Sequence, residues 1–155
     1  MKLTIISIIL LMATLTSLAQ ITEGNNGLFY KKNSDELYTG NYAEYFANGQ
    51  KKVEMYIKDG MKNGEIILYF ENGNIKEKRS YKQNKKHGKW ITYNKNNRKI
   101  AEANYLNDKK DGKWLIWDDN GTLLFEMYYL QGKKTGTWKM WDSKGELISK
   151  KKYNQ

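Results

Sequence analysis

The stretch GKWLIWDDNGTLLFEMYY, residues 112–129, holds the pattern that decides the fold. It opens on a glycine, with a large apolar residue two positions later and an aromatic residue five positions later. The same phrase returns every 24 residues without insertion or deletion, and its glycines are Gly40, Gly64, Gly88, Gly112 and Gly136. Such regularity is typical of stacked supersecondary units, each of which needs its neighbour to bury its apolar face.

Each unit contains two turn signals. In this stretch the first is Asn120-Gly121, and the second follows eleven residues later at Gln131-Gly132. Two turns predict two strands per unit, and Asn-Gly is typical of a two-residue hairpin turn in which both residues have positive φ. A helix is not expected, because no segment between turn signals exceeds about eleven residues or shows helical spacing of apolar residues.

A two-residue turn at Asn120-Gly121 fixes the pairing of the two strands. Gly112 then faces Tyr129, and the same count sets the other repeated glycines opposite Tyr81, Tyr105 and Tyr153. We expect each tyrosine ring to cover the backbone that glycine leaves bare. In the first unit Ile57 stands opposite Gly40 instead. The two strands of a unit differ in length, so we also expect a bulge at the repeated glycine.

The composition favours a thin sheet over a thick globule. The chain has 155 residues, with no proline or cysteine, and it carries twelve tyrosines and five tryptophans against four phenylalanines. Tyrosine and tryptophan suit a half-exposed β surface because their polar atoms can stay in contact with water. The residues therefore predict an all-β protein, built from tandem antiparallel hairpin repeats in a thin sheet.

The first residues resemble a cleaved export signal. Lys2 precedes an apolar run from Leu3 to about Met12, and Ser17-Leu18-Ala19 places small residues where a signal peptidase cuts. An uncleaved membrane anchor is the alternative, although the apolar run is shorter than the ~20 residues that span a bilayer. We expect a signal peptide at 1–19, a leader and capping hairpin at 20–39, and five repeats at 40–63, 64–87, 88–111, 112–135 and 136–155. The mature protein is then periplasmic, at the cell surface or secreted.

The residues needed for catalysis or for a cofactor are not found in a recognisable pattern. The single histidine, His87, lies beside a hairpin turn among lysines, and there is no cysteine to pair with it. Asp118, Asp119 and Asp142 adjoin first turns, where we expect them to cap or solvate the turn. No glycine-rich loop joins a strand to a helix as a phosphate site requires. The sequence predicts no catalytic, metal or cofactor site and no small-molecule substrate.

The charge gathers around the second turns. The net charge is +10, or +9 without Lys2, and the lysines near these turns should line one long edge at intervals of two strand spacings, about 9.6 Å. We call the following set the basic ridge: Lys62, Lys85, Lys86, Lys109, Lys110, Lys133 and Lys134. These lysines either keep the protein soluble and prevent other strands from pairing with the sheet, or they contact an acidic protein, an anionic lipid or an acidic glycan. Nucleic acid is disfavoured because arginine, the usual base-reading residue, is scarce.

Three tryptophans are expected to form a column, also with a spacing of about 9.6 Å. They are Trp90, Trp114 and Trp138. Such a column either packs along a curled sheet or faces solvent as a platform on which a sugar can stack.

From Leu28 onward the chain resembles the MORN-type repeat proteins, and within them the bacterial group called YwqK-family antitoxins. Their units read roughly G-x-W-x-x-Y-x-x-N-G, and GLFYKKNSDELYTG at Gly27–Gly40 looks like the leader of that group. The resemblance implies an elongated antiparallel β-meander of hairpin repeats, a single twisted or curled layer that contacts other molecules rather than performing chemistry. The first repeat lacks the tryptophan and looks like a degenerate capping unit, and an export signal departs from the cytoplasmic setting of an antitoxin. We therefore expect an exported, non-enzymatic module for an unidentified protein partner, with antitoxin-like neutralisation of that partner as one form of this role. The alternative is binding to an envelope surface, lipid or glycan.

Overall fold

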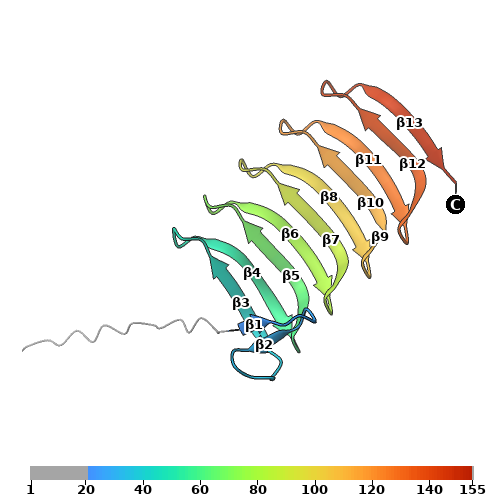
Figure 1. Cartoon of the computed structure of the whole chain (residues 1–155). Coiled ribbons are helices and arrows are strands. Elements are labelled where there is room, and N and C mark those ends of the chain that lie inside the picture. The colour runs from blue at the N-terminus through green and yellow to red at the C-terminus, as the bar shows by residue number, and fades with distance from the viewer. Residues whose placement is uncertain (1–20, 155) are drawn as a thin grey trace, which may run out of the picture.

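The computed structural model describes residues 21–154, which form one long antiparallel sheet and a short N-terminal hairpin (Figure 1). Consecutive strands pair from β3 to β8 and from β10 to β13, and both β9 and β10 pair with β8, so the sheet is a meander. The strands are β1 (Ile21–Glu23), β2 (Phe29–Lys31), β3 (Gly40–Tyr45), β4 (Lys51–Lys58), β5 (Met61–Tyr69), β6 (Ile75–Lys82), β7 (Lys85–Tyr93), β8 (Lys99–Leu106), β9 (Lys109–Lys110), β10 (Gly112–Trp117), β11 (Leu123–Leu130), β12 (Lys133–Trp141) and β13 (Leu147–Tyr153). The predicted all-β meander is confirmed. The described residues include no helix long and apolar enough to cross a membrane, and the expected export signal at 1–19 lies outside them.

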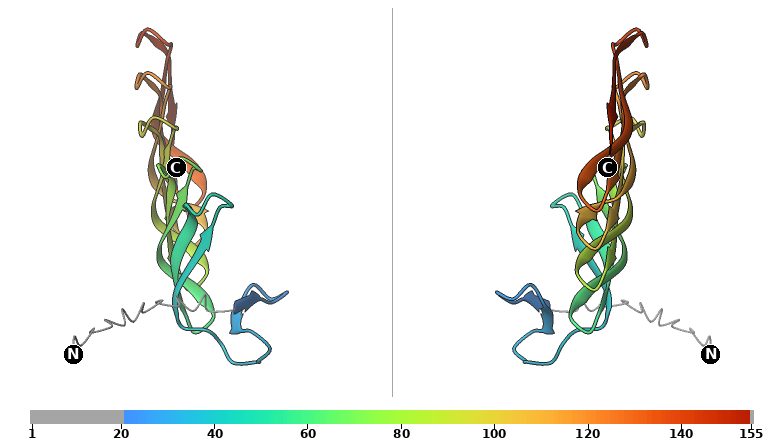
Figure 2. Two further views of the ribbon diagram at one scale, coloured as in Figure 1. Left: turned by 90° about the vertical axis from the view of Figure 1, so that its left-hand side faces the viewer. Right: turned by 90° about the vertical axis from the view of Figure 1, so that its right-hand side faces the viewer.

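Seen edge-on, the sheet is one twisted layer (Figure 2). A single layer leaves most side chains partly exposed, and among the described residues only Phe29, Ile57 and Ile66 are buried apolar side chains. All three lie at the N-terminal end, where the hairpin β1–β2 stands off one side of the sheet. The rest of the sheet must therefore be held by contacts between neighbouring strands rather than by a deep core.

The first turns are not the two-residue turns that Asn-Gly predicts. The Gly121 amide donates to the Asp118 carbonyl (3.1 Å), the Asp118 amide donates to the Thr122 carbonyl (3.0 Å), and only Gly121 in this turn has positive φ. These are the features of a three-residue loop, a type I turn followed by a left-handed glycine. The Asp118 side chain accepts hydrogen bonds from two amides of the same loop, which fixes its shape.

The register is nevertheless the predicted one, since a second irregularity restores the count. Pairing passes from Trp117 with Leu123 to Ile116 with Phe125, which skips one residue of β11. Beyond this bulge the repeated glycines face their tyrosines, in the pairs Gly64–Tyr81, Gly88–Tyr105, Gly112–Tyr129 and Gly136–Tyr153, and Gly40 faces Ile57. An extra loop residue and an extra strand residue compensate each other.

The two-residue turns lie at the other end of the strands. At each second turn both central residues have positive φ, as at Gln131 (48°) and Gly132 (89°), and Leu130 pairs directly with Lys133. This is the type I′ geometry, which matches the twist of the strands. The sequence predicts the positions of both turns correctly. It predicts the type I′ conformation at the first turn, whereas the structure has this conformation at the second turn.

The surplus in strand length is absorbed at the repeated glycine. Between β4 and β5, pairing runs from Met55 with Ile66 to Ile57 with Lys62, so β5 has two extra residues around Gly64. In the corresponding bulge of a later unit Gly112 has φ of 87°, and a Cβ added there would meet Cβ of Asn104 at 3.5 Å. The glycine is needed for this left-handed conformation, and the tyrosine opposite it has a different role, described below.

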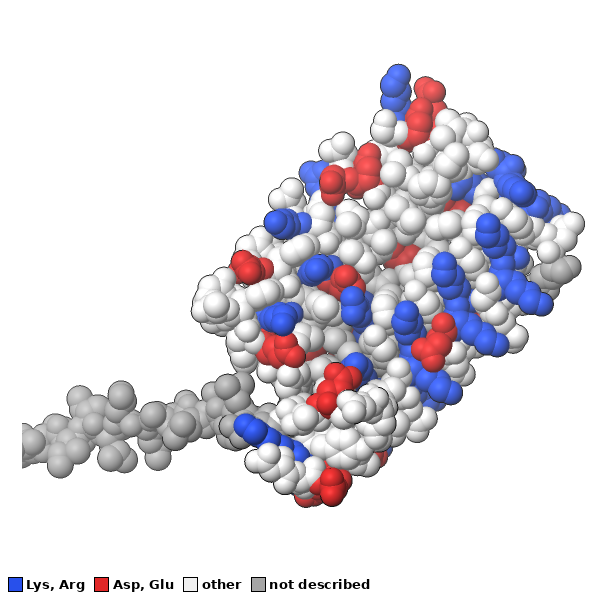
Figure 3. Space-filling model, viewed as in Figure 1, with Lys and Arg blue, Asp and Glu red and all other residues white. Residues whose placement is uncertain are grey.

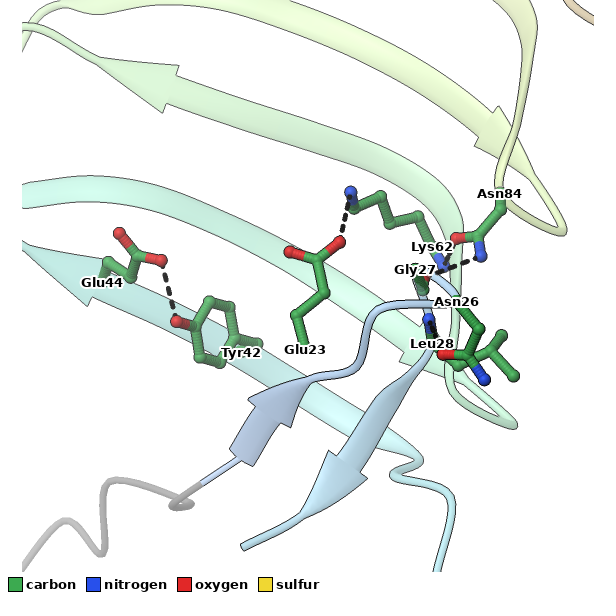
Figure 4. A network of polar contacts seen from close by, with 8 residues as sticks. All are labelled: Glu23, Asn26, Gly27, Leu28, Tyr42, Glu44, Lys62 and Asn84. Atoms are coloured by element: carbon green, nitrogen blue, oxygen red, sulfur yellow. Dashed lines mark hydrogen bonds and ion pairs between the residues drawn. The ribbon is translucent and has the colours of Figure 1, made fainter.

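The hairpin β1–β2 caps the first repeat. The Phe29 amide donates to the Gly60 carbonyl (2.8 Å), and the Gly60 amide donates to the Tyr38 carbonyl (2.8 Å). Asn84, in the second turn of the next repeat, donates from Nδ2 to the Gly27 carbonyl at 3.1 Å and accepts the Lys62 amide at 2.7 Å (Figure 4). The cap is thus tied to two successive second turns.

Replacing Gly60 by alanine should weaken this contact. A Cβ there would lie 2.7 Å from Cδ2 of Leu37 and 3.0 Å from the Phe29 carbonyl oxygen, whereas one at Gly132, in the same turn position, would meet nothing within 4 Å. Both residues have positive φ, so Gly132→Ala should lose about 1 kcal/mol from backbone strain alone and Gly60→Ala about 2 kcal/mol. Urea denaturation measures both, and equal losses would contradict the packing of the cap on Gly60.

Candidate functional site

Seven aromatic rings form a continuous column on one face of the sheet. We call it the aromatic ladder, and its members are Tyr81, Trp90, Tyr105, Trp114, Tyr129, Trp138 and Tyr153. Successive centroids lie 4.9–5.4 Å apart with interplanar angles between 48° and 66°. Tilted pairs at this distance add about 0.5–1.5 kcal/mol each beyond the area they bury. The predicted tryptophan column exists, and the tyrosines opposite the glycines fill the gaps between its members.

Each tryptophan is locked in place by a hydrogen bond to the facing strand. The Nε1 atoms of Trp90, Trp114 and Trp138 donate to the carbonyls of Ser80, Asn104 and Tyr128, at 3.0, 3.0 and 2.9 Å. Partial burial also raises the pKa of Tyr81 and of Tyr105. The three tryptophans are half-buried and lie between tyrosines, so the column packs along the sheet, which is one of its two expected roles.

The basic ridge separates into two rows, because successive residues of a strand point to opposite faces. The inner lysine row lies on the ladder face and consists of Lys62, Lys86, Lys110 and Lys134. The Nζ atom of Lys110 lies 4.3 Å from the Trp114 centroid and 4.8 Å from that of Tyr129. Lys86 and Lys134 sit over their own tryptophan–tyrosine pairs at 4.5–5.3 Å. Three of these ammonium groups are therefore held by cation–π attraction over the ladder.

The outer lysine row, on the opposite face, consists of Lys85, Lys109 and Lys133. All three are exposed, and no ring lies beneath any of them among the cation–π contacts of residues 21–154. Figure 3 shows basic side chains gathered along the edge formed by the second turns, whereas the opposite edge carries both signs of charge. The predicted edge of lysines is present. Sequence reasoning missed that its lysines lie in two rows on opposite faces, and that only the inner row lies over aromatic rings.

The basic ridge has almost no internal counterions. Within residues 21–154 only Lys62 of this set forms an ion pair, with Glu23 at 3.5 Å (Figure 4). Asp108 lies close to the ridge, but its Oδ1 accepts the backbone amide of Lys86 (2.8 Å) and so holds a turn in place. Asp59 and Asp108 lie in second turns and Asp111 follows one, so the edge carries an excess of positive charge rather than positive charge alone.

Two glutamates on the face opposite the ladder each contact two lysines. Glu102 lies 2.9 Å from both Lys89 and Lys99, and Glu126 contacts Lys113 and Lys139 at 3.5 and 3.4 Å. Partial burial alone would raise the pKa of Glu102, but the hydrogen bonds and charges of its two lysines outweigh burial and lower it. The charge on this face is neutralised around these two glutamates, whereas the outer lysine row on the same face has no such pairs.

The lowered pKa of Glu102 predicts a pH-dependent contribution to stability. A carboxyl whose pKa is lower in the folded state stabilises the fold at pH above its unfolded value, about 4.3, and loses that effect as pH falls through the folded value. Glu102→Gln should therefore lower the unfolding free energy by about 1 kcal/mol at pH 7, and the two stability curves should converge below pH ~4. Urea titrations across pH measure this. Glu146→Gln, at a first turn and without an ion pair among the described residues, should change stability at pH 7 by less than about 0.5 kcal/mol.

The histidine and the aspartates singled out in the sequence contribute to turns. Residues 21–154 contain no group of three or more His, Asp or Glu side chains arranged to hold a metal ion. Nδ1 of His87 lies 3.3 Å from Oδ1 of Asn107 at a turn. Asp118 and Asp142 accept backbone amides in their first turns, and Asp119 accepts from Asn94 of the neighbouring first turn.

Three segments of the chain match the family model described as MORN repeat variant, at residues 62–83, 110–131 and 134–155. These three segments are similar to the MORN repeat variant. Each matched segment begins at an inner-row lysine, Lys62, Lys110 or Lys134, and runs through the bulge and the first turn. The first two segments end in the next second turn, and the third ends at residue 155. Repeats of this family are non-catalytic modules that generally serve in protein or membrane interactions. No match to a curated protein was found.

Proposed function

We propose that this MORN-repeat protein is an exported interaction module that binds a protein partner through the basic ridge, as a toxin-neutralising protein would. The single observation that carries the proposal is the gathering of unpaired lysines along one edge of the sheet (Figure 3). Six of the seven ridge lysines have no carboxylate partner among the described residues, while Glu102 and Glu126 each contact two lysines on the opposite face.

Uncompensated charge along one edge favours an anionic partner over a neutral one. Mutual repulsion of like charges lowers the stability of a folded chain, and a partner that brings carboxylates removes that repulsion on binding. The second turns also follow one another along one edge of the sheet, and together they form a long strip for contact. An anionic envelope surface is the second candidate, because the exposed outer lysine row has the charge that such a surface attracts.

The test is capture of partners from the envelope fraction of the producing cell. The ridge variant replaces Lys85, Lys86, Lys109, Lys110, Lys133 and Lys134 by glutamine. The control variant makes the same change in charge at exposed lysines elsewhere, namely Lys32, Lys76, Lys95, Lys144, Lys150 and Lys152. The native and control proteins should capture the same partner, and the ridge variant should lose it. Equal capture by all three would exclude the ridge as the contact surface.

Export is tested separately by N-terminal sequencing of the mature protein. Cleavage after Ala19 should give a mature chain that begins at Gln20. Recovery of Met1 from mature material would contradict export, and the partner would then be sought inside the cell.

A further inference from the structure

Lys62 already binds a carboxylate on the ladder face. Its Nζ atom lies 5.4 Å from the centroid of Phe29 and 3.5 Å from Oε1 of Glu23. Both partners belong to the cap hairpin, Glu23 in β1 and Phe29 in β2, and Figure 4 shows Glu23 reaching Lys62 from this short extended segment. The first inner lysine is therefore occupied by an acidic strand of the chain itself.

The other three inner lysines have the aromatic contact without the carboxylate. Lys86, Lys110 and Lys134 lie over ladder rings as Lys62 lies over Phe29, yet none forms an ion pair within residues 21–154. Because the rings restrict these side chains in advance, less conformational freedom is lost when an anion binds. The outer lysines lack this support, which makes the inner row the better site.

The spacing of the inner lysines selects the conformation of the ligand. Equivalent positions are two strands apart, about 9.6 Å. Every third residue of a polyproline II helix returns to the same side after about 9.3 Å, whereas same-side residues of a β-strand are about 6.6 Å or 13 Å apart. Carboxylates at every third residue of a polyproline II segment therefore match the row, and aromatic-lined surfaces are the usual binding sites for such segments.

We propose that the ladder face binds an acidic segment of a protein partner in the polyproline II conformation, with carboxylates at every third residue paired to Lys86, Lys110 and Lys134. The residues between the carboxylates lie on the ladder rings between the lysines. This inference rests on the proposed function and specifies the chemistry of the partner.

The first experiment compares two synthetic peptides with the full-length protein at low salt. One has the sequence Glu-Pro-Pro repeated three times; the other has the same composition with its three glutamates at alternate positions. Tryptophan emission follows binding, because Trp90, Trp114 and Trp138 lie beneath the lysines. The first peptide should bind about fivefold more tightly, because only its carboxylates reach all three lysines together. Equal affinities would overturn the match in spacing.

The second experiment uses two variants with the same loss of charge. Replacing Lys86, Lys110 and Lys134 by glutamine should weaken binding of the Glu-Pro-Pro peptide about tenfold, whereas the same replacement of Lys85, Lys109 and Lys133 should weaken it less than about threefold. Equal losses of affinity in the two variants would overturn the proposal, because net charge alone would then account for binding. Circular dichroism checks both folds, and if the inner variant unfolds, replacement of the inner lysines by arginine tests the site, since it should keep affinity within about threefold.

Anionic vesicles and dextran sulfate are the competing ligands. Tighter retention of either than of the Glu-Pro-Pro peptide, measured at the same salt concentration, would overturn the assignment to an acidic protein segment. If a protein is captured from the envelope fraction through the ridge while neither peptide binds, the proposed function stands and this inference falls.

Discussion

Replacement of Ile57 by alanine is expected to lower the unfolding free energy by about 4 kcal/mol, a large fraction of the stability of a small domain. Ile57 is fully buried, and no other large side chain of the described residues is buried to that extent. It pairs with Gly40 on one side and Lys62 on the other, at the end of the sheet that the cap covers. A cavity there removes packing between the cap and the first repeat. Urea denaturation, followed by circular dichroism, measures the loss.

The same substitution at Ile148 is the matched control. Ile148 lies in β13 and is 57% exposed, so Ile148→Ala should change the unfolding free energy by less than about 0.5 kcal/mol. Similar losses at both positions would mean that residue type rather than burial decides the effect, and the small core beneath the cap would lose its assigned role.

The register was predictable from sequence because the 24-residue period leaves few ways to pair the strands. Counting back from Asn120-Gly121 sets Gly112 opposite Tyr129, and the structure has this pair. The turn conformation was not predictable by the same reasoning. Asn-Gly fits both a two-residue turn and a type I turn ending in a left-handed glycine. The bulge beside Leu123 that compensates the longer loop is made by apolar residues with no distinctive local signal.

The two lysine rows follow from a rule that was available in the sequence. Lys85 and Lys86 are consecutive residues of one strand, so their side chains must lie on opposite faces. The sequence predicts the ladder tyrosines as covers for glycine and not as ladder members, although pairing to Gly88 and Gly112 places Tyr105 and Tyr129 beside the tryptophan column. The contact of Lys62 with Glu23 lay beyond such reasoning, because residues 20–39 are outside the periodic array.

Replacement of Trp114 by alanine is expected to lower the unfolding free energy by about 3 kcal/mol. Its ring lies 5.2 Å from that of Tyr105 and 5.4 Å from that of Tyr129, and it supports the ammonium of Lys110. Trp114 also stands midway along the ladder. In an array where each repeat contacts only its neighbours, a gap at this position uncouples the repeats on either side. The urea denaturation transition should therefore become broader, and its midpoint should fall.

Trp114→Phe separates the two interactions of this residue. Phenylalanine keeps an aromatic ring between Tyr105 and Tyr129 but loses the 3.0 Å hydrogen bond from Nε1 to the Asn104 carbonyl. If stacking holds the repeats together, this variant should lose only about 1 kcal/mol, the usual net effect of one hydrogen bond, and denaturation should stay cooperative. A loss as large as that of the alanine variant would assign the stability of the ladder to the bond between tryptophan and the facing strand. The tyrosines between the tryptophans would then fill space without coupling one repeat to the next.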